Sequence, residues 1–173
     1  MFCIYTYIAD TILDVTKTAP YTISIAMVMF GIGSTLGNYL LGKAADKSAI
    51  KTTGLALVCT IVFAIAYVSA SYNIWLLYTV IFLIGCSVGL ATLIQSLLMD
   101  VAPEGHAMIG ALVQCAFNTA NAIGPWVGGA VIAQGAAPNQ TGYVAAALFL
   151  GGLVMWFLSY LQLNRQQATA QTC

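Results

Sequence analysis

The sequence predicts an all-α membrane protein with six transmembrane helices. Two observations indicate this fold class. Of the 173 residues, 61% are hydrophobic and only 6% are charged, whereas about a quarter of the residues of a soluble domain carry a charge. Apolar stretches of about 20 residues, the length of a helix that crosses a bilayer, alternate with short polar loops. So few charges could not cover a surface in water, and we expect the chain to lie in a lipid bilayer.

The first predicted helix, residues 2–15, differs from the others in length. Its apolar run is about 12 residues long, when a span needs about 20, and it contains Asp10. With no basic residues before it, the run is also a poor signal peptide. We therefore expect the chain to begin partway through this helix.

Five further predicted helices follow in order. Pro20 suits the first turn of the second helix, and the later loops contain Pro and Gly, which end helices. The five predicted spans are residues 21–42, 52–71, 74–99, 107–134 and 143–163. Residues 1–163 are thus predicted to form one bundle, and residues 164–173 a polar cytoplasmic tail without regular structure.

The charged loop after the second helix predicts the orientation in the membrane. It holds Lys43, Lys47 and Lys51, whereas Lys17 belongs to a loop at the other end of the bundle. Cytoplasmic loops carry an excess of Lys and Arg. Together with Arg165, four of the five basic residues fall on the side of the lysine loop. Both ends of the chain are therefore predicted to be cytoplasmic, in a multi-pass inner membrane protein.

Several functions are not expected from this composition. The net charge is zero, which gives no reason to expect a nucleic-acid partner. One histidine and five cysteines without C-x-x-C spacing make a metal site improbable. The sequence shows no nucleophile with a base and no phosphate loop. We expect no cofactor, no metal and no enzymatic activity.

Three predicted helices carry the spacing G-x-x-x-G: Gly33–Gly37, Gly85–Gly89 and Gly124–Gly128. Glycines one turn apart let two helix backbones approach closely. The pattern indicates tight helix packing, a sliding surface for a conformational change, or both, because a moving bundle needs smooth helix faces.

The fifth predicted helix carries a stripe of amides. Gln114, Asn118, Asn121 and Pro125 lie at i, i+4, i+7 and i+11, on one helical face. Amides both donate and accept hydrogen bonds, so the stripe could line a pathway for a polar solute. It could equally form hydrogen bonds between helices. Pro125 lies among glycines and predicts a kink or flexible point.

Other polar side chains are weaker candidates. Tyr7, Asp10 and Asp14 share a face of the first helix, and a buried carboxylate at Asp10 could take up a proton during transport. The alternative is that both aspartates are solvated near the outer interface. Gln95 lies on a face with Ser87 and Ala91 and indicates a polar seam.

The run from Gly42 to Lys47 resembles the G-x-x-x-D-[RK] signature of the major facilitator superfamily. Residues 30–47 are similar to its second copy in bacterial drug:proton antiporters of the arabinose-efflux-permease type. Residues 5–9 resemble helix 7 of those exporters, and residues 116–129 resemble their helix 11, with its asparagines and terminal glycines. The resemblance covers residues 1–163.

The resemblance implies one half of a major facilitator fold, the C-terminal half of a twelve-helix transporter. It implies secondary active efflux of a sugar, nucleoside or drug by proton antiport, with a missing N-terminal half as partner. The substrate pathway would include Tyr7, Asp10, Gln95, Gln114, Asn118 and Asn121, and Gly42, Asp46 and Lys47 would act in gating. The alternative is a non-transporting fragment or assembly subunit from a truncated or split transporter gene.

Overall fold

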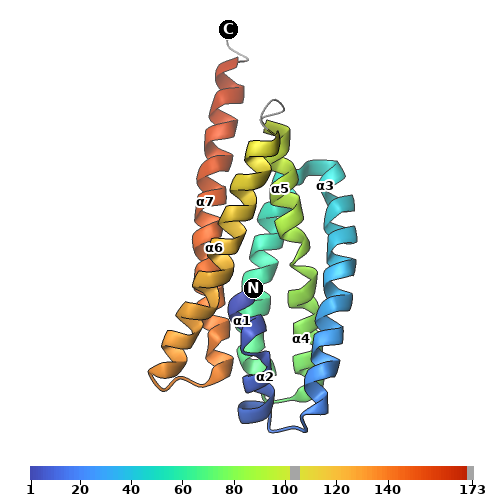
Figure 1. The fold of residues 1–173 in the computed structure, drawn as a ribbon. Helices are drawn as coiled ribbons and strands as arrows, with labels where there is room; N and C mark the ends of the chain where they lie inside the picture. Colours follow the sequence, from blue (N-terminus) through green and yellow to red (C-terminus); the bar gives the residue numbers. More distant parts are fainter. Residues whose placement is uncertain (102–105, 171–173) are drawn as a thin grey trace.

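The computed structural model describes the backbone of residues 1–101 and 106–170 and the side chains of residues 1–99 and 107–162. This part of the chain is a bundle of helices without strands (Figure 1), which confirms the all-helical class. The polar loop predicted between the fourth and fifth helices falls largely outside the described residues.

The short first segment lies in the middle of the bundle. It consists of α1 (Phe2–Thr6), α2 (Ile8–Asp10) and the π-helix η1 (Thr11–Thr16). Ile4, Ile8 and Ile12 are at most 1% exposed, because their spacing of four places them on one face. The segment predicted as an incomplete span is therefore a central part of the core (Figure 1).

Helix α3 (Tyr21–Ala70) joins the second and third predicted segments into one element. The lysine stretch predicted as a loop is helical except at Ser48, whose backbone is extended. At Ser48 the chain reverses, so a first arm, residues 21–47, and a second arm, residues 49–70, run in opposite directions (Figure 1). The Thr52 hydroxyl donates to the Ala44 carbonyl across the bend at 3.0 Å, and this bond satisfies a helix-end acceptor that a loop would leave to water.

Two of the three glycine pairs pack against each other. Helix α4 (Ile74–Cys86) lies against the first arm of α3. A Cβ added to Gly33 would collide with the Phe82 carbonyl oxygen, and one added to Gly85 would collide with that of Phe30. Backbone therefore meets backbone in both directions, which is the close approach that the spacing predicts.

The contact continues past a break in the fourth predicted span. Helix α4 ends at Cys86, and α5 (Gly89–Val101) begins after two non-helical residues. A Cβ on Gly89 would lie 2.7 Å from the Gly37 carbonyl oxygen. The first arm therefore packs closely against the α4–α5 break, where Gly37 of the arm meets Cys86 and Gly89.

The last elements close the bundle around α1. Helix α6 (His106–Ala133) continues through Pro125, and a Cβ on Gly128 would lie 2.9 Å from Cys3 Sγ, so the third glycine pair packs against α1. The short 3₁₀-helix η3 (Pro138–Gln140) leads into α7 (Thr141–Ala170). Helix α7 continues past residue 164, where the sequence predicts a tail without regular structure, and residues 171–173 lie outside the described part.

A network of buried hydrogen bonds ties the first segment to its neighbours. Tyr67 donates to Thr11 Oγ1 at 2.8 Å, and Thr16 donates to the Ser71 carbonyl at 2.7 Å. The Asn139 amide donates to Ser71 Oγ at 2.8 Å. These groups come from η1, the end of α3 and η3, so the network fixes the end of the bundle opposite to the lysine bend.

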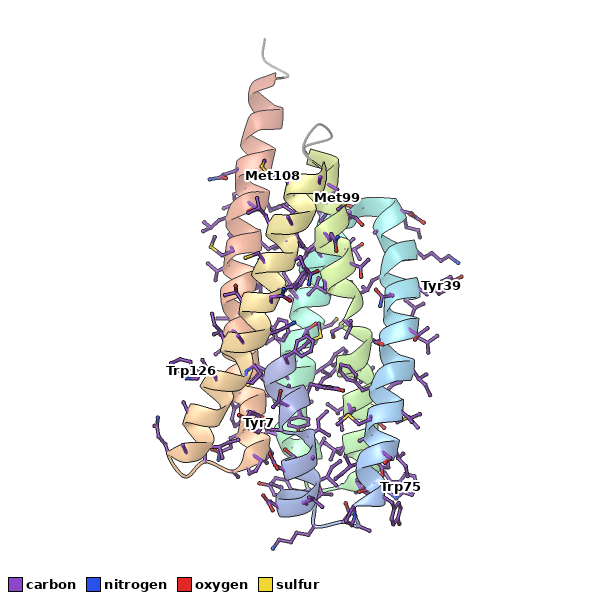
Figure 2. All side chains as sticks on the ribbon, viewed as in Figure 1. Tyr7, Tyr39, Trp75, Met99, Met108 and Trp126 are labelled. Atoms are coloured by element: carbon purple, nitrogen blue, oxygen red, sulfur yellow. The ribbon has the colours of Figure 1, made fainter. Side chains whose placement is uncertain are left out.

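The surface is apolar, as expected for a protein surrounded by lipid. Leu55, Val62 and Phe157 are all more than half exposed on α3 and α7. Trp75 is 78% exposed and points outward near one end of the bundle (Figure 2), where Trp is enriched at a membrane interface. Among the described residues, three helical stretches are long and apolar enough to cross a membrane, and they are Tyr21–Ala70, Ile74–Met99 and Pro138–Gln162. Six spans stay a prediction.

Candidate functional site

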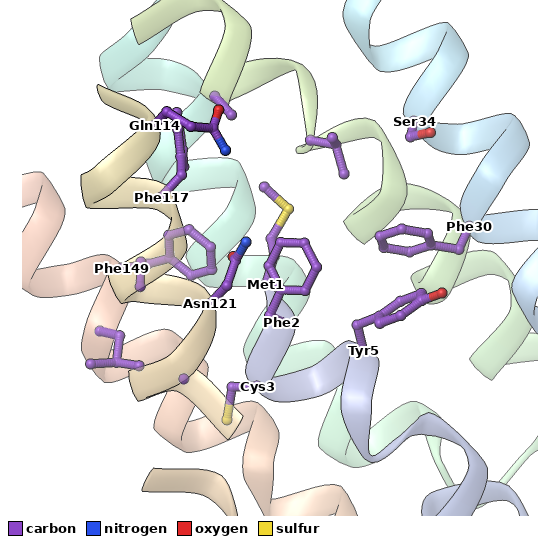
Figure 3. A pocket seen from close by; sticks show the side chains of 15 residues that line it. Met1, Phe2, Cys3, Tyr5, Phe30, Ser34, Gln114, Phe117, Asn121 and Phe149 are labelled. Atoms are coloured by element: carbon purple, nitrogen blue, oxygen red, sulfur yellow. The ribbon is translucent and has the colours of Figure 1, made fainter. Parts of the chain in front are cut away.

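A cavity of about 500 Å³ opens in the bundle beside α1. Its walls come from α1, the first arm of α3, the start of α5, and the facing sides of α6 and α7. This volume is in the usual range for pockets that take a small organic ligand, about 300–1,000 Å³. We call this cavity the central pocket (Figure 3).

Aromatic rings make up much of the pocket lining. Tyr5 and Phe30 form one side, with ring centroids 4.9 Å apart. Phe117 and Phe149 lie on the opposite side (Figure 3). Flat apolar rings on facing walls can hold an apolar face of a ligand by burial and dispersion.

Four polar side chains interrupt this apolar lining. Gln114 and Asn121 come from α6, Ser34 from α3 and Tyr5, with its ring hydroxyl, from α1 (Figure 3). The Ser34 hydroxyl donates to the Gly31 carbonyl of its own helix at 2.9 Å. The two amides and the Tyr5 hydroxyl are therefore the groups that can direct hydrogen bonds to a ligand.

The amide stripe is only partly at the pocket. Gln114 and Asn121 line it, whereas Asn118 is exposed and outside the lining. Gln114 Nε2 donates to Asn118 Oδ1 at 3.2 Å, and this bond restrains the orientation of the Gln114 side chain. The stripe is thus a pair of lining amides with one supporting residue.

Pro125 adds a backbone group to the same wall. Because Pro125 has no N–H, the carbonyl of Asn121 lacks the helical donor that it would otherwise have. Tyr7 donates its hydroxyl to the Pro125 carbonyl at 2.9 Å, and a Cβ on Gly129 would lie 2.6 Å from the Tyr7 oxygen. The Tyr7 hydrogen bond therefore joins the first segment to α6 close to the pocket, but Tyr7 does not line the pocket.

Two further candidates from the sequence lie away from the pocket. Asp10 is exposed at the end of α2, as is Asp14 on η1. Gln95 is half-buried on α5, while its neighbour on the predicted seam, Ala91, does line the pocket. Neither of the two carboxylates lines the central pocket, and Gln95 does not line it either.

A second hollow of about 410 Å³ lies at the lysine bend. Gly42 and Asp46 line it from α3, and Thr92 and Ser96 line it from α5. Lys47 is exposed and outside this lining. We call this hollow the signature groove. Two of the three residues predicted to act in gating are thus brought together with polar groups of another helix.

Among the side chains that the structure describes, one hydrogen bond joins the two helices of the groove. The Thr92 hydroxyl donates to Asn38 Oδ1 at 2.8 Å. Four residues earlier in each segment, Ser34 on α3 and Val88 just before α5 line the central pocket. The seam between α3 and α5 therefore separates the pocket from the groove, with the Asn38–Thr92 bond just on the groove side.

Sequence reasoning missed this bond and the aromatic lining. Asn38 lies inside the stretch that resembles the signature, four residues after Ser34 and four before Gly42, and this spacing places the three on one face. That periodicity was the available signal for Asn38. The aromatic residues gave no signal of their own, because a Phe on a membrane helix occurs as often in a packed core or facing lipid as it does in a ligand pocket.

Comparisons with known proteins agree with the geometry. The family model described as Major Facilitator Superfamily matches residues 1–171. The inner membrane transport protein YdhP of Escherichia coli (strain K12) is 31% identical over 166 residues, which cover 92% of this chain and 41% of that protein. A probable sugar efflux transporter of Helicobacter acinonychis is 25% identical, over 90% of this chain and 40% of its own length.

A third relative is an uncharacterized MFS-type transporter of Bacillus subtilis, YfhI, which is 27% identical over 90% of this chain and 38% of its own. The chain thus spans about two fifths of the length of the curated relatives that it matches. No solved structure matches the chain. The match of the family model over nearly every residue shows that this chain belongs to the major facilitator superfamily of membrane transporters.

Proposed function

We propose that this chain is the C-terminal half of a secondary active exporter and forms one wall of its substrate site. The central pocket is the observation that carries the proposal, since it joins aromatic rings and two amide side chains inside a membrane bundle. In transporters built from repeats, the substrate lies near the membrane midplane between the two units. A complementary six-helix half would supply the other wall.

The substrate proposed from the relatives is a small solute of the sugar, nucleoside or drug classes. One relative is named a probable sugar efflux transporter, and amide side chains suit hydroxyl groups because they donate and accept hydrogen bonds. Efflux would be driven by protons that enter in exchange.

The test is reconstitution with and without the other half. The chain alone in proteoliposomes is expected not to move solute, and the chain co-expressed with a complementary N-terminal half is expected to export against a proton gradient. Failure of the completed protein to transport any solute would favour the alternative, a non-transporting fragment or assembly subunit. Reading the DNA upstream of Met1 for six further spans separates these origins.

Asp10 is the proposed proton carrier. It is a carboxylate on the segment that lies against the pocket walls, and transport by antiport requires a group that gains and loses a proton. Asp10→Asn in the completed transporter is expected to abolish efflux driven by a pH gradient while solute exchange at equal pH continues. Asp14→Asn is the matched control, since Asp14 is similarly exposed. Normal proton-driven efflux in Asp10→Asn would assign coupling to another group.

The signature groove is the proposed gate. Gly42, Asp46 and Lys47 would close one side of the transporter, and the Asn38–Thr92 bond would hold α5 against α3 in the closed state. Asp46→Asn is expected to lower the rate of efflux severalfold, because a carboxylate that meets the N-terminus of a neighbouring helix in the closed state would contribute about 0.3–1 kcal/mol through its charge. Solute binding should be unchanged, because Asp46 lies outside the pocket lining. Equal losses of binding and efflux would contradict a gating role.

The proposed orientation places the lysine bend and both ends of the chain in the cytoplasm. In a variant without native cysteines, a membrane-impermeant maleimide should label Lys17→Cys in intact cells and Lys47→Cys only in inverted vesicles. Both side chains are exposed, so access to them depends on the side of the membrane. The reverse pattern of labelling would overturn the orientation.

A further inference from the structure

We propose that the central pocket selects uncharged amphipathic solutes, those with a flat apolar face and a hydrogen-bonding edge, and rejects carboxylates and amines. This inference rests on the proposed function and names the substrate class of the same site. It comes from the chemistry of the lining and from where the charges of the described residues lie.

No charged side chain lines the pocket among the residues described. The lining holds aromatic, aliphatic and small side chains, with Ser34, Gln114, Asn121 and the Tyr5 hydroxyl as its polar groups. The described acidic and basic side chains lie elsewhere: Asp46 is in the signature groove, and Asp10 and Lys17 are exposed near the opposite end. Apart from the Met1 amine, the described lining offers no ionic partner, so a charged group in the pocket would lose its hydration without compensation, which is unfavourable.

The two kinds of lining group meet within one cavity. Phe117, Asn121 and Gln114 occupy the same wall on α6, and Phe30 and Tyr5 face them across the opening (Figure 3). A ligand ring between these walls would bury its apolar face while its edge reaches the amides. Gln114 is held in place by its bond to Asn118, so it need not be ordered by the ligand.

The proton route is separate from the ligand site under this proposal. A solute without charge gives no electrostatic repulsion to a proton, and the pocket lining offers no described carboxylate that both could compete for. Coupling would then act through the movement of helices, not through displacement of a proton by the solute.

The test compares three ligands of one shape. Phenyl β-glucoside, phenyl β-glucuronide and the 6-amino-6-deoxy glucoside differ in charge at one carbon. Their binding to the chain in lipid nanodiscs is measured by saturation-transfer NMR. Met1 also lines the pocket, so the measurements are made with its amine free and acetylated. The neutral glucoside is expected to bind at least about tenfold more tightly than either ion, a difference of about 1.4 kcal/mol.

Every outcome decides the proposal. Equal or tighter binding of an ion, or no saturation transfer to the glucoside, would overturn it. Because binding is measured without transport, a chain that shows the neutral preference and yet supports no efflux would count against the proposed function alone.

A second test uses a variant that places a negative charge in the pocket. Ser34→Asp places a carboxylate on the lining and should raise the affinity for the amine relative to the glucoside by about tenfold or more. Ser24→Asp is the control, because Ser24 is exposed on the same arm of α3 and does not line the pocket. An unchanged ratio of amine affinity to glucoside affinity in folded Ser34→Asp would show that the three ligands bind outside the pocket.

Discussion

Gly37→Ala is expected to destabilise the bundle by about 3 kcal/mol or more, the largest effect that we expect from a methyl group added to any of the described glycines. The added Cβ would collide with the Cys86 backbone, including its carbonyl oxygen. Overpacking against movable side chains typically costs about 1–3 kcal/mol, and backbone of a neighbouring helix cannot turn aside. The first arm of α3 would have to separate from α4 and α5 along the glycine seam, which is the line of backbone contacts formed by Gly33, Gly37, Gly85 and Gly89.

Gly31→Ala is the matched control on the same arm. A Cβ there meets nothing within 4 Å, and alanine favours a helix by up to about 1 kcal/mol over glycine. Gly31→Ala should therefore be as stable as the original chain or slightly more so. Unfolding with SDS in mixed micelles measures both variants. Equal stability of Gly37→Ala and Gly31→Ala would mean that the two helices are not in close contact at Gly37.

The glycine seam also shows what the sequence could predict about the fold. The G-x-x-x-G spacing identified Gly33, Gly37, Gly85 and Gly89 as positions of close approach, and all four lie at backbone contacts. It could not predict that these two pairs meet each other, because spacing along one helix carries no information about the partner. The apolar runs did predict helices, because a run in lipid must satisfy its own backbone hydrogen bonds, and the described part of the chain is helical without strands.

The lysine bend is where the sequence reasoning was wrong about local structure. Charges and Gly42 suggested a loop from residue 43 to residue 51, yet only Ser48 leaves the helical backbone. Lysine and alanine are good helix formers, so the helix continues into the charged stretch until one extended residue reverses it. Composition predicts the side of the membrane that this stretch prefers but carries no information about its conformation.

The candidate site was predicted in part. The amide stripe was found because amides are unusual on a membrane helix, and two of its members line the pocket. Thr92 was missed, because a threonine hydroxyl on a helix usually bonds its own backbone four residues earlier, as Thr79 and Thr119 do. Only the placement of α5 against α3 shows that Thr92 donates to Asn38 instead.

Asn121→Leu is expected to lower efflux by the completed transporter about tenfold or more. The two side chains are similar in size, so the change mainly removes a donor and an acceptor from the pocket wall (Figure 3). Leaving the polar edge of a ligand unpaired in a buried site costs about 1–3 kcal/mol, and about 1.4 kcal/mol corresponds to a factor of ten. Initial rates of solute efflux from proteoliposomes measure the loss.

Thr119→Val on the same helix is the control. Thr119 is exposed, its hydroxyl donates to the Cys115 carbonyl of its own helix at 2.9 Å, and it does not line the pocket. Both variants remove a polar group from α6, so a general effect on helix insertion or stability would lower efflux in both. A loss confined to Asn121→Leu would assign the effect to the pocket, whereas equal efflux by Asn121→Leu and the original protein would place the solute on another wall. The comparison is sharp because Asn121 and Thr119, two residues apart on one helix, differ in what they face.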